Sequence, residues 1–335
     1  MALVGVAGAA VAGGQVGPLM GAGPSPTAPA TSIPVSTAAP ARSPTATPTP
    51  EPPAPPVSPA AAACATAVTM SVWAHYDDDL IFANPVLQDA MAAGDCVRTV
   101  FVTASDAGRG MAYSQGRELG ILRAYNTMRG QEGFWSENSV TLLSGAELSQ
   151  FSPDGDPDIT IAFLRLPDGN LNGDGFSSTG HATLPKLLDG AIADLSPVTG
   201  APALSSEGLV VSVAELIQAY EPARLLTHVP SDSAEWSAGD HPDHGATGTY
   251  ARAAWQRAGF PAGQVLYAIG YPSASLPANV GGDVLTQKIA AFRTYAALDP
   301  VVTCATDAAC LAKPRFGEWL QRNHLRSEAE LFPAG

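Results

Sequence analysis

From residue 63 onward, short apolar runs alternate with longer segments of helical character, and this alternation constrains the fold more than any other feature. The runs 67–74 (AVTMSVWA) and 97–104 (VRTVFVTA) are rich in β-branched residues, a pattern typical of buried parallel strands. The segment 84–93 lies between them and is expected to be helical, as is 113–129. Strands and helices in alternation predict a layered α/β fold.

The alternation continues toward the end of the chain. We expect further strands near 159–164, 224–228 and 265–269, and further helices near 184–195, 211–220, 245–258 and 284–298. The segments 144–183 and 196–210 are rich in Gly, Pro, Asp and Ser, which predicts loops over one edge of the sheet. The 335 residues, 46% of them hydrophobic, suffice for one large domain or two small ones, and we assign one domain to 63–333.

Two segments precede that domain. Residues 1–22 begin with small apolar residues, and Ala10 and Ala12 have the spacing of a signal-peptidase site, so an export segment is expected there. The basic residues that open such a segment are missing, so either the start codon is placed too late or this is not an export signal. Residues 23–62 are almost entirely Pro, Ala, Thr and Ser, which predicts a disordered linker or a glycosylated stalk.

Charge and hydropathy limit the cellular locations and the binding partners that we expect for the protein. The formal net charge is -14, and residues 1–62 carry only Arg42 and Glu51, so the negative charge belongs to the folded part. Such a surface would repel nucleic acid but suits a neutral sugar or a cationic amino-sugar product. No later run of apolar residues is long enough for a transmembrane segment. We therefore expect a secreted or cell-envelope-associated protein, attached to a wall or envelope through the stalk.

The chain contains four cysteines, Cys64, Cys96, Cys304 and Cys310. An even number after an export segment predicts two disulfides, for which three pairings exist. Cys304 with Cys310 would close a short loop and leave Cys64 with Cys96, so this pairing is favoured. Four reduced thiols are the alternative. None of the spacings is the Cys-x-x-Cys of a structural zinc site.

Polar clusters follow the predicted strands at 74–79 (AHYDDD), 104–106 (ASD) and, after a longer loop, 240–244 (DHPDH). Ligands of open parallel α/β sheets bind beyond the carboxyl ends of the strands, so the three clusters are expected to share one cleft. There, His75, Asp78 and His244 have the residue types and the His-x-x-Asp spacing for one divalent cation. Fe²⁺ is one possible ion for such a site.

The other members of these clusters suggest roles around that cation. Three adjacent aspartates repel one another unless a cation or solvent compensates. Asp77, beside a metal-activated water, would be the general base, and His241 the electrophile or general acid. Asp243 and Asp106 are expected to support the site from behind, and Asp243 or Asp240 would orient the imidazoles.

Each of these motifs also has an ordinary structural interpretation. An acidic run is commonly a solvated loop, and Asp79 is expected to cap a helix that begins near Ile81. His181 and His324 stand alone in the sequence and are expected on loops or a helix surface. His228 ends a predicted strand, where a hydrogen-bonded structural histidine is the favoured interpretation.

Over residues 68–260 the sequence resembles the PIG-L/LmbE-like de-N-acetylase family. AHYDDD at 74–79 is similar to the family's AHPDDE, residues 103–108 to its TDGExG, and the HPDH at 241–244 is intact. An Arg-containing helix at 117–130 follows the second motif. Tyr76 replaces a Pro and Asp79 a Glu, while Ala104, Ser105 and Asp106 replace Asp, Gly and Glu; no proposed ligand is lost.

The resemblance implies a Rossmann-like fold, zinc bound by His75, Asp78 and His244, Asp77 as base and His241 at the oxyanion. It also implies the reaction, hydrolysis of the acetamide of an N-acetylated sugar such as an N-acetylglucosamine conjugate. Arg117 would contact substrate, although the family's Arg-x-x-Glu is absent. In the segment 164–176, Asp168 and Asn170 would hydrogen-bond sugar hydroxyls, or else form a tight Asp-Gly turn.

Two other functions fit parts of the pattern. His75-x-Asp77 with a distant histidine is the ligand set of a non-haem iron oxygenase, although such enzymes are generally all-β. A secreted carbohydrate-binding module without catalysis would need the stalk and the loops, but neither a base nor an oxyanion partner. The deacetylase remains the favoured interpretation.

Overall fold

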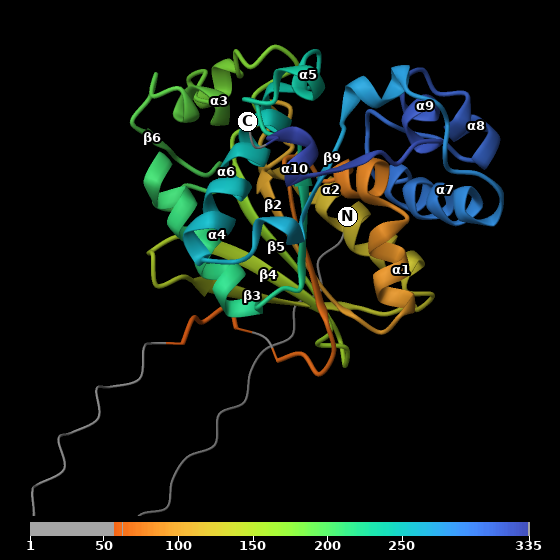
Figure 1. The fold of residues 1–335 in the computed structure, drawn as a ribbon, viewed down its shortest axis with the longest axis horizontal. Coiled ribbons are helices and arrows are strands. Elements are labelled where there is room, and N and C mark those ends of the chain that lie inside the picture. Colours follow the sequence, from red (N-terminus) through yellow and green to blue (C-terminus); the bar gives the residue numbers. More distant parts are fainter. Residues whose placement is uncertain (1–56, 62, 334–335) are drawn as a thin grey trace, which may run out of the picture. The chain divides into compact units, whose positions relative to one another are not determined.

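The structure, a computed structural model, describes residues 57–61 and 63–333. Its centre is an eight-stranded sheet with strand order β10-β9-β8-β1-β2-β5-β4-β3 (Figure 1). Its strands are β1 (Val68–Trp73), β2 (Cys96–Thr103), β3 (Trp135–Thr141), β4 (Glu147–Pro153), β5 (Ile159–Leu166), β8 (Arg224–His228), β9 (Val265–Ala268) and β10 (Leu325–Ser327). A separate two-stranded sheet pairs β6 (Asp194–Leu195) with β7 (Leu204–Ser205).

The middle of the large sheet is parallel and its edges are antiparallel. β1 lies between β2 and β8 and is parallel to both, with Val72 paired to Val100 and to Thr227. β5 and β9 extend the parallel part on either side, whereas β4 pairs antiparallel with β5, β3 with β4, and β10 with β9. All residues of β1 and β2 are buried, as expected for strands covered on both faces. The predicted mostly parallel, Rossmann-like α/β fold is confirmed.

Helices cover both faces of the sheet (Figure 1). The α-helices are α1 (Val86–Ala92), α2 (Met111–Met128), α3 (Leu184–Leu188), α4 (Ser206–Tyr220), α5 (Ala234–Ser237), α6 (Pro242–Ala258), α7 (Gly282–Ala296), α8 (Asp307–Leu311), α9 (Phe316–Leu320) and α10 (Glu328–Leu331). Short 3₁₀ turns are η2 (Ser177–Thr179), η3 (Ala262–Gln264) and η4 (Tyr271–Ser275), and η1 (Asp79–Ala83) is a π-helical turn.

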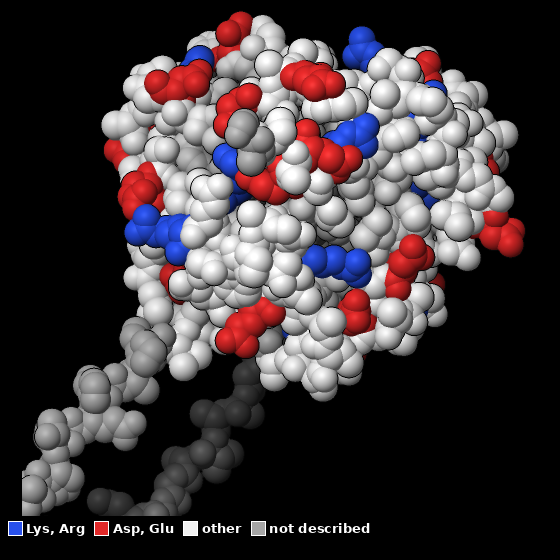
Figure 2. Space-filling model, viewed as in Figure 1, with Lys and Arg blue, Asp and Glu red and all other residues white. Residues whose placement is uncertain are grey.

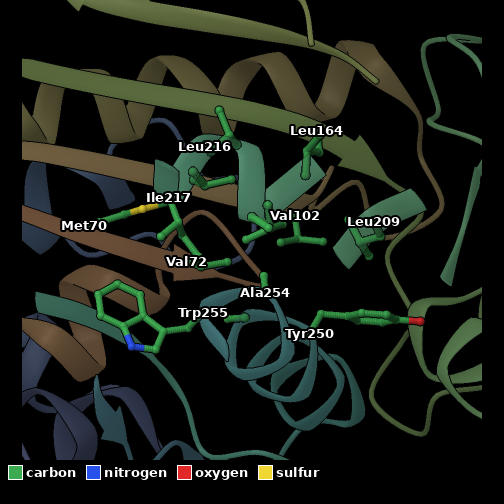
Figure 3. Packing of buried hydrophobic residues seen from close by; sticks show 14 of the residues in the cluster. Met70, Val72, Val102, Leu164, Leu209, Leu216, Ile217, Tyr250, Ala254 and Trp255 are labelled. Atoms are coloured by element: carbon green, nitrogen blue, oxygen red, sulfur yellow. The ribbon is translucent and has the colours of Figure 1, made fainter. Parts of the chain in front are cut away.

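The core has two halves because alternate residues of each strand face opposite sides of the sheet. In β2, Val100 and Val102 belong to the half covered by α4 and α6, whereas Val97 and Phe101 belong to the half covered by α1, α2 and α7. Figure 3 shows Leu216 and Ile217 of α4 and Trp255 of α6 packed near Met70 and Val72 of β1, in the first half. Burying each such large side chain contributes about 1.5–3 kcal/mol.

Helix ends follow local sequence. Ser205 precedes α4, and its hydroxyl accepts a hydrogen bond from the Gly208 N–H at 3.0 Å, satisfying an N–H that the helix leaves free. α6 begins with Pro242, whose missing N–H is no loss at a first helical position. Further along α6, a Cβ on Gly248 would lie 2.3 Å from the His228 carbonyl oxygen, so only glycine lets α6 pack this closely on β8.

Both favoured disulfides are present. Cys64 is bonded to Cys96, which ties the segment before β1 to the start of β2, and Cys304 is bonded to Cys310 of α8. The expected export segment at 1–22 lies outside the described residues, and so does the expected linker apart from 57–61.

Three local predictions were wrong. The helix expected at 184–195 ends at Leu188, since Gly190 follows with a φ of 73°. The loop expected at 144–183 contains β4, which pairs with the polar edge strand β3 and with β5. Asp79 does not cap a helix: it is the first residue of η1, and no side chain caps that turn.

None of the described helices has the length and apolar composition needed to span a bilayer. On the face seen in Figure 2, basic side chains are scattered among neutral and acidic ones.

Candidate metal centre and catalytic cavity

The candidate site lies at the carboxyl edge of the sheet, between β1 and β8. After β1 the chain continues to β2 on one side, and it later returns through β8 and β9 on the other. The crevice at such a switch in strand order is where open α/β sheets bind ligands. His75 follows the end of β1, His228 ends β8, and His241 and His244 lie at the start of α6.

Three side chains from these segments bring their donor atoms together. Nδ1 of His75 lies 3.4 Å from Oδ2 of Asp78, and Nε2 of His244 lies 3.1 Å from Oδ1 of Asp78. The two ring nitrogens are 3.3 Å apart, and all three residues are buried. Zinc–ligand bonds of ~2.0–2.2 Å at tetrahedral angles separate ligand atoms by about 3.3–3.6 Å. Each of these pairwise distances agrees with that spacing, although His75 and His244 face different oxygens of Asp78.

A carboxylate stands behind each of the two imidazoles. Nε2 of His75 lies 3.3 Å from Asp243 Oδ2, and Nδ1 of His244 lies 2.8 Å from Asp240 Oδ1, so both rings turn their other nitrogen toward Asp78. The Gly169 N–H donates to the same Asp243 oxygen at 2.7 Å. The other oxygen, Oδ1, is buried without a partner in the described part of the chain.

The charges at this centre favour a cation. Burial alone would lower the pKa of His75, but Asp78 and Asp243 raise it well above its ordinary value. Burial would likewise lower the pKa of His244, and Asp78 and Asp240 raise it to about 9. Burial would raise the pKa of Asp78, yet the imidazoles hold it well below the usual range. The protein thus places positive charge where a divalent ion would lie, and the residues present fit a metal.

The structure brings His228 into this centre, although the sequence interpretation set it apart. Its Nε2 lies 3.0 Å from Asp78 Oδ2, and its ring stacks on that of His244 with centroids 4.0 Å apart. Burial, with the neighbouring His244 charge, lowers its pKa to about 4, so the ring is neutral. Asp78, His228 and His244 form one group of side chains able to hold an ion, and His75, His241 and His244 form another. The position of His228 at a strand end was the only available signal.

Asp77 lies beside the candidate metal centre and faces the cavity. Its Oδ1 accepts a hydrogen bond from Nη2 of Arg117 at 3.1 Å. Burial raises the pKa of Asp77 to about 6, against the opposing effect of Arg117. Arg117, predicted as a substrate contact, also lines the cavity, but its guanidinium is bound within the protein: it donates to Tyr295 at 2.6 Å and to the Ser105 carbonyl at 2.7 Å.

His241 faces the same cavity, and its ring centroid is 4.5 Å from that of His75. The Asp243 N–H donates to its Nδ1 at 3.1 Å. Burial, with the charge on His75, lowers its pKa to about 3, so the ring is neutral. A neutral ring that accepts at Nδ1 carries its proton on Nε2, and the hydrogen bond thus assigns the tautomer.

Asp79, the third aspartate of the acidic run, does not belong to the candidate site. Asp79 accepts a hydrogen bond from the Tyr125 hydroxyl at 2.6 Å in the core. Burial raises its pKa to about 8, so it is protonated at neutral pH. Only two of the three carboxylates, those of Asp77 and Asp78, therefore remain to repel each other.

A cavity of about 430 Å³ adjoins the centre. Asp168 and Asn170 line it and also form the tight turn, in which the Asn170 N–H donates to Asp168 Oδ1 at 2.8 Å. Asp106 holds this turn from behind by accepting from the Asp168 N–H at 3.3 Å, rather than by contacting an imidazole. His181 and His324 lie away from the cavity and hydrogen-bond to backbone carbonyls.

Another part of the cavity lining comes from the C-terminal part of the chain, which sequence reasoning missed. We call it the C-terminal wall: Val301, Val302, Arg315, Phe316 and Trp319. Tyr271 also lines the cavity and stacks on Trp319 with centroids 4.4 Å apart. No motif marks these residues, so no local signal could have found them.

Comparison with known proteins defines the class. The family model described as PIG-L, GlcNAc-PI de-N-acetylase, matches residues 70–255, more than half of the chain. The chain belongs to this family, and the resemblance seen in the sequence is confirmed. The comparison with curated proteins gave no match.

Several solved structures are similar to this chain at low sequence identity. The conserved protein TT1542 from Thermus thermophilus is 16% identical, with 78% of this chain and 93% of that chain covered and a TM-score of 0.42. A deacetylase–teicoplanin complex from teicoplanin biosynthesis is 16% identical, with 70% and 88% covered and a TM-score of 0.41. GalB, the 4-carboxy-2-hydroxymuconate hydratase of Pseudomonas putida, is 11% identical, with 68% and 78% covered and a TM-score of 0.39. Scores this low say nothing about the activity of this chain.

Proposed function

We propose that the protein is a zinc-dependent hydrolase that removes the acetyl group from an N-acetylated amino sugar. The observation that carries this proposal is the meeting of donor atoms from His75, Asp78 and His244 at 3.1–3.4 Å, beside a cavity lined by Asp77 and His241. Zinc would be held by those three residues, and when bound it would supply Lewis-acid catalysis and activate a water molecule.

Asp77 is the general base in this proposal. It takes a proton from the attacking water as the new carbon–oxygen bond forms at the acetyl carbonyl. Its pKa of about 6, raised by burial, lies close to neutral pH, where a base that must also return a proton is most effective. Asp77 then gives the proton to the amine nitrogen as the amide bond breaks and acetate leaves.

His241 stabilises the oxyanion. Its Nε2–H points to the role of a neutral hydrogen-bond donor to the carbonyl oxygen, where negative charge develops. Its lowered pKa argues against the second role considered from the sequence, that of a general acid, because a neutral ring has no extra proton to release.

The substrate we propose is an N-acetylglucosamine-type glycan, glycolipid or conjugate. Asp168 and Asn170 would accept and donate hydrogen bonds to its hydroxyls, and the aromatic side chains of the C-terminal wall would contact its apolar faces. The two disulfides agree with an extracellular setting. With an export segment at 1–22 and a stalk at 23–62, the domain at 63–333 would act outside the cell or at its envelope.

The test combines metal content with acetate release. Full-length protein is stripped of metal, reloaded with zinc and incubated with chitooligosaccharides and N-acetylglucosamine conjugates. We expect one zinc per chain and acetate release that chelation abolishes and zinc restores. Oxygen consumption with iron would instead identify an oxygenase, and sugar binding without bound metal or acetate would identify a carbohydrate-binding module.

A further inference from the structure

A chain of buried polar groups stands behind the proposed base, and it ends in a part of the protein beyond the family match at 70–255. The Arg117 guanidinium lies between two carboxylates. Its Nη2 is 3.1 Å from Asp77 Oδ1, and its Nε is 2.9 Å from Asp299 Oδ2. Asp299 comes from the segment after α7 and is 1% exposed. Nothing in the family match accounts for this second carboxylate.

Asp299 is itself held in place from several directions. The Val301 and Val302 N–H groups donate to its Oδ1 at 2.7 and 3.0 Å, and the Tyr295 hydroxyl donates to its Oδ2 at 2.6 Å. Tyr295 in turn accepts from Arg117 Nε at 2.6 Å. A carboxylate with this many donors cannot turn away from Arg117 without losing several hydrogen bonds.

These contacts of Arg117 determine how many hydrogen bonds its guanidinium forms with Asp77. A guanidinium beside a single carboxylate commonly forms two parallel hydrogen bonds and engages both oxygens. Here Nε contacts Asp299 and Tyr295, and Nη1 donates to the Ser105 carbonyl. Asp77 receives a single contact, from Nη2 to Oδ1. Within the described residues, Asp77 Oδ2 has no hydrogen-bond partner.

We propose that Asp299 is a positioning residue: together with Tyr295 it fixes Arg117 so that the guanidinium touches one oxygen of Asp77 and leaves the other free to accept a proton. This inference rests on the proposed function. Asp299 acts through Arg117 and contacts no reacting atom in this role. The C-terminal segment therefore contributes to catalysis as well as to the cavity wall.

The main test is Asp299→Asn in the full-length zinc-loaded protein. The amide oxygen can still accept from Val301 and Val302, so the turn is kept while the charged link to Arg117 is lost. We expect kcat for acetate release to fall about 10- to 100-fold, as for other small misplacements of a catalytic group, with KM and zinc content within about twofold of wild type. Asp307→Asn is the matched control, since Asp307 pairs with Arg293 in the same region at the surface, and we expect no change.

A double variant separates positioning from general stabilisation. In an Arg117→Gln background, Asp299→Asn is expected to have no further effect on kcat, because the residue through which it acts is gone. An additive loss in that background would overturn the proposal, as would unchanged kcat in the single variant or a rise in KM alone.

Crystal structures of wild type and Asp299→Asn test the same proposal without any activity. We expect Arg117 in the variant to engage both oxygens of Asp77. An unchanged guanidinium would overturn the positioning role. If Arg117 turns as expected but wild type releases no acetate, the proposed reaction is wrong and the positioning of Asp77 stands.

Discussion

The cavity has two walls of different origin. One is polar and comes from the segment after β1 and the start of α6, both inside the family match; His75, Asp77 and His241 belong to it. The C-terminal wall is mostly apolar and lies outside the match, with Val301 and Trp319 as examples. The polar wall follows from two short motifs, whereas the C-terminal wall is assembled from segments without any motif.

The difference separates two tasks. Parallel strands end at one edge of a sheet, so short polar motifs that follow them lie close together because of the sheet topology alone. The proposed chemistry depends on these motifs. The C-terminal wall contributes mostly apolar side chains to the cavity, and in the proposed function it contacts the substrate. Variants of the polar wall should therefore change metal content or kcat, and variants of the C-terminal wall should change KM.

The largest effect is expected from Asp78→Ala. The variant loses the carboxylate shared by His75 and His244, so zinc should not be retained and acetate release should be lost. Without metal, the buried imidazoles also lose their counter-charge, and breaking such a pair costs about 3–5 kcal/mol. Elemental analysis, acetate release and denaturant unfolding would measure the three changes. Asp283→Ala, at an exposed position in α7, is the control and should match wild type; zinc retained at one per chain in Asp78→Ala would contradict the ligand assignment.

Asp77→Asn should separate metal binding from catalysis. The amide keeps the size of the side chain but cannot accept the proton from water, so kcat should fall about 10²- to 10⁴-fold with zinc content unchanged. Steady-state kinetics and elemental analysis on the same preparation would check this. Activity within about tenfold of wild type would remove Asp77 from the role of base.

A smaller effect is expected at the C-terminal wall. Val301 is 55% exposed at the cavity, and Val301→Ser removes apolar surface without touching the polar wall. Loss of about one methylene contact, about 0.8 kcal/mol, corresponds to a rise in KM of about fourfold. The kcat and zinc content should not change. Leu143→Ser, at a similarly exposed residue away from the cavity, is the matched control, and an equal KM change there would contradict the assignment of the wall.

Much of the fold could be predicted because buried parallel strands leave a clear apolar signal. The run at 97–104 corresponds to β2 almost residue for residue. β3 was missed because its middle residues are polar and exposed, as an antiparallel edge allows. The pairing of β3 with β4 depends on tertiary structure, and the residues of either strand alone do not indicate it.

For the candidate site, the sequence predicted which segments converge, while the roles of the residues stay predictions. The convergence of His75 and His244 follows from sheet topology, and the structure brings them together although 169 residues separate them. Asp299 and Trp319 could not be found, because a lone Asp or Trp in the sequence carries no information about a cavity formed by distant segments. Arg117 was named, but as a substrate contact; only the structure reveals the carboxylates on either side of it.

The smallest effect on catalysis is expected from Lys288→Met, because Lys288 is not among the residues that line the cavity. Lys288 is fully buried on α7, and its Nζ donates to the Arg322 carbonyl at 2.7 Å. Burial lowers its pKa from 10.5 to about 7, so between those pH values the unfolded chain binds a proton that the folded chain does not. Stability should therefore rise with pH across this window, by up to about 1.4 kcal/mol per unit from this group. Denaturant unfolding of wild type and variant from about pH 7 to 10 should differ in that slope, while kcat and KM agree; equal slopes would show that Lys288 keeps its proton when folded.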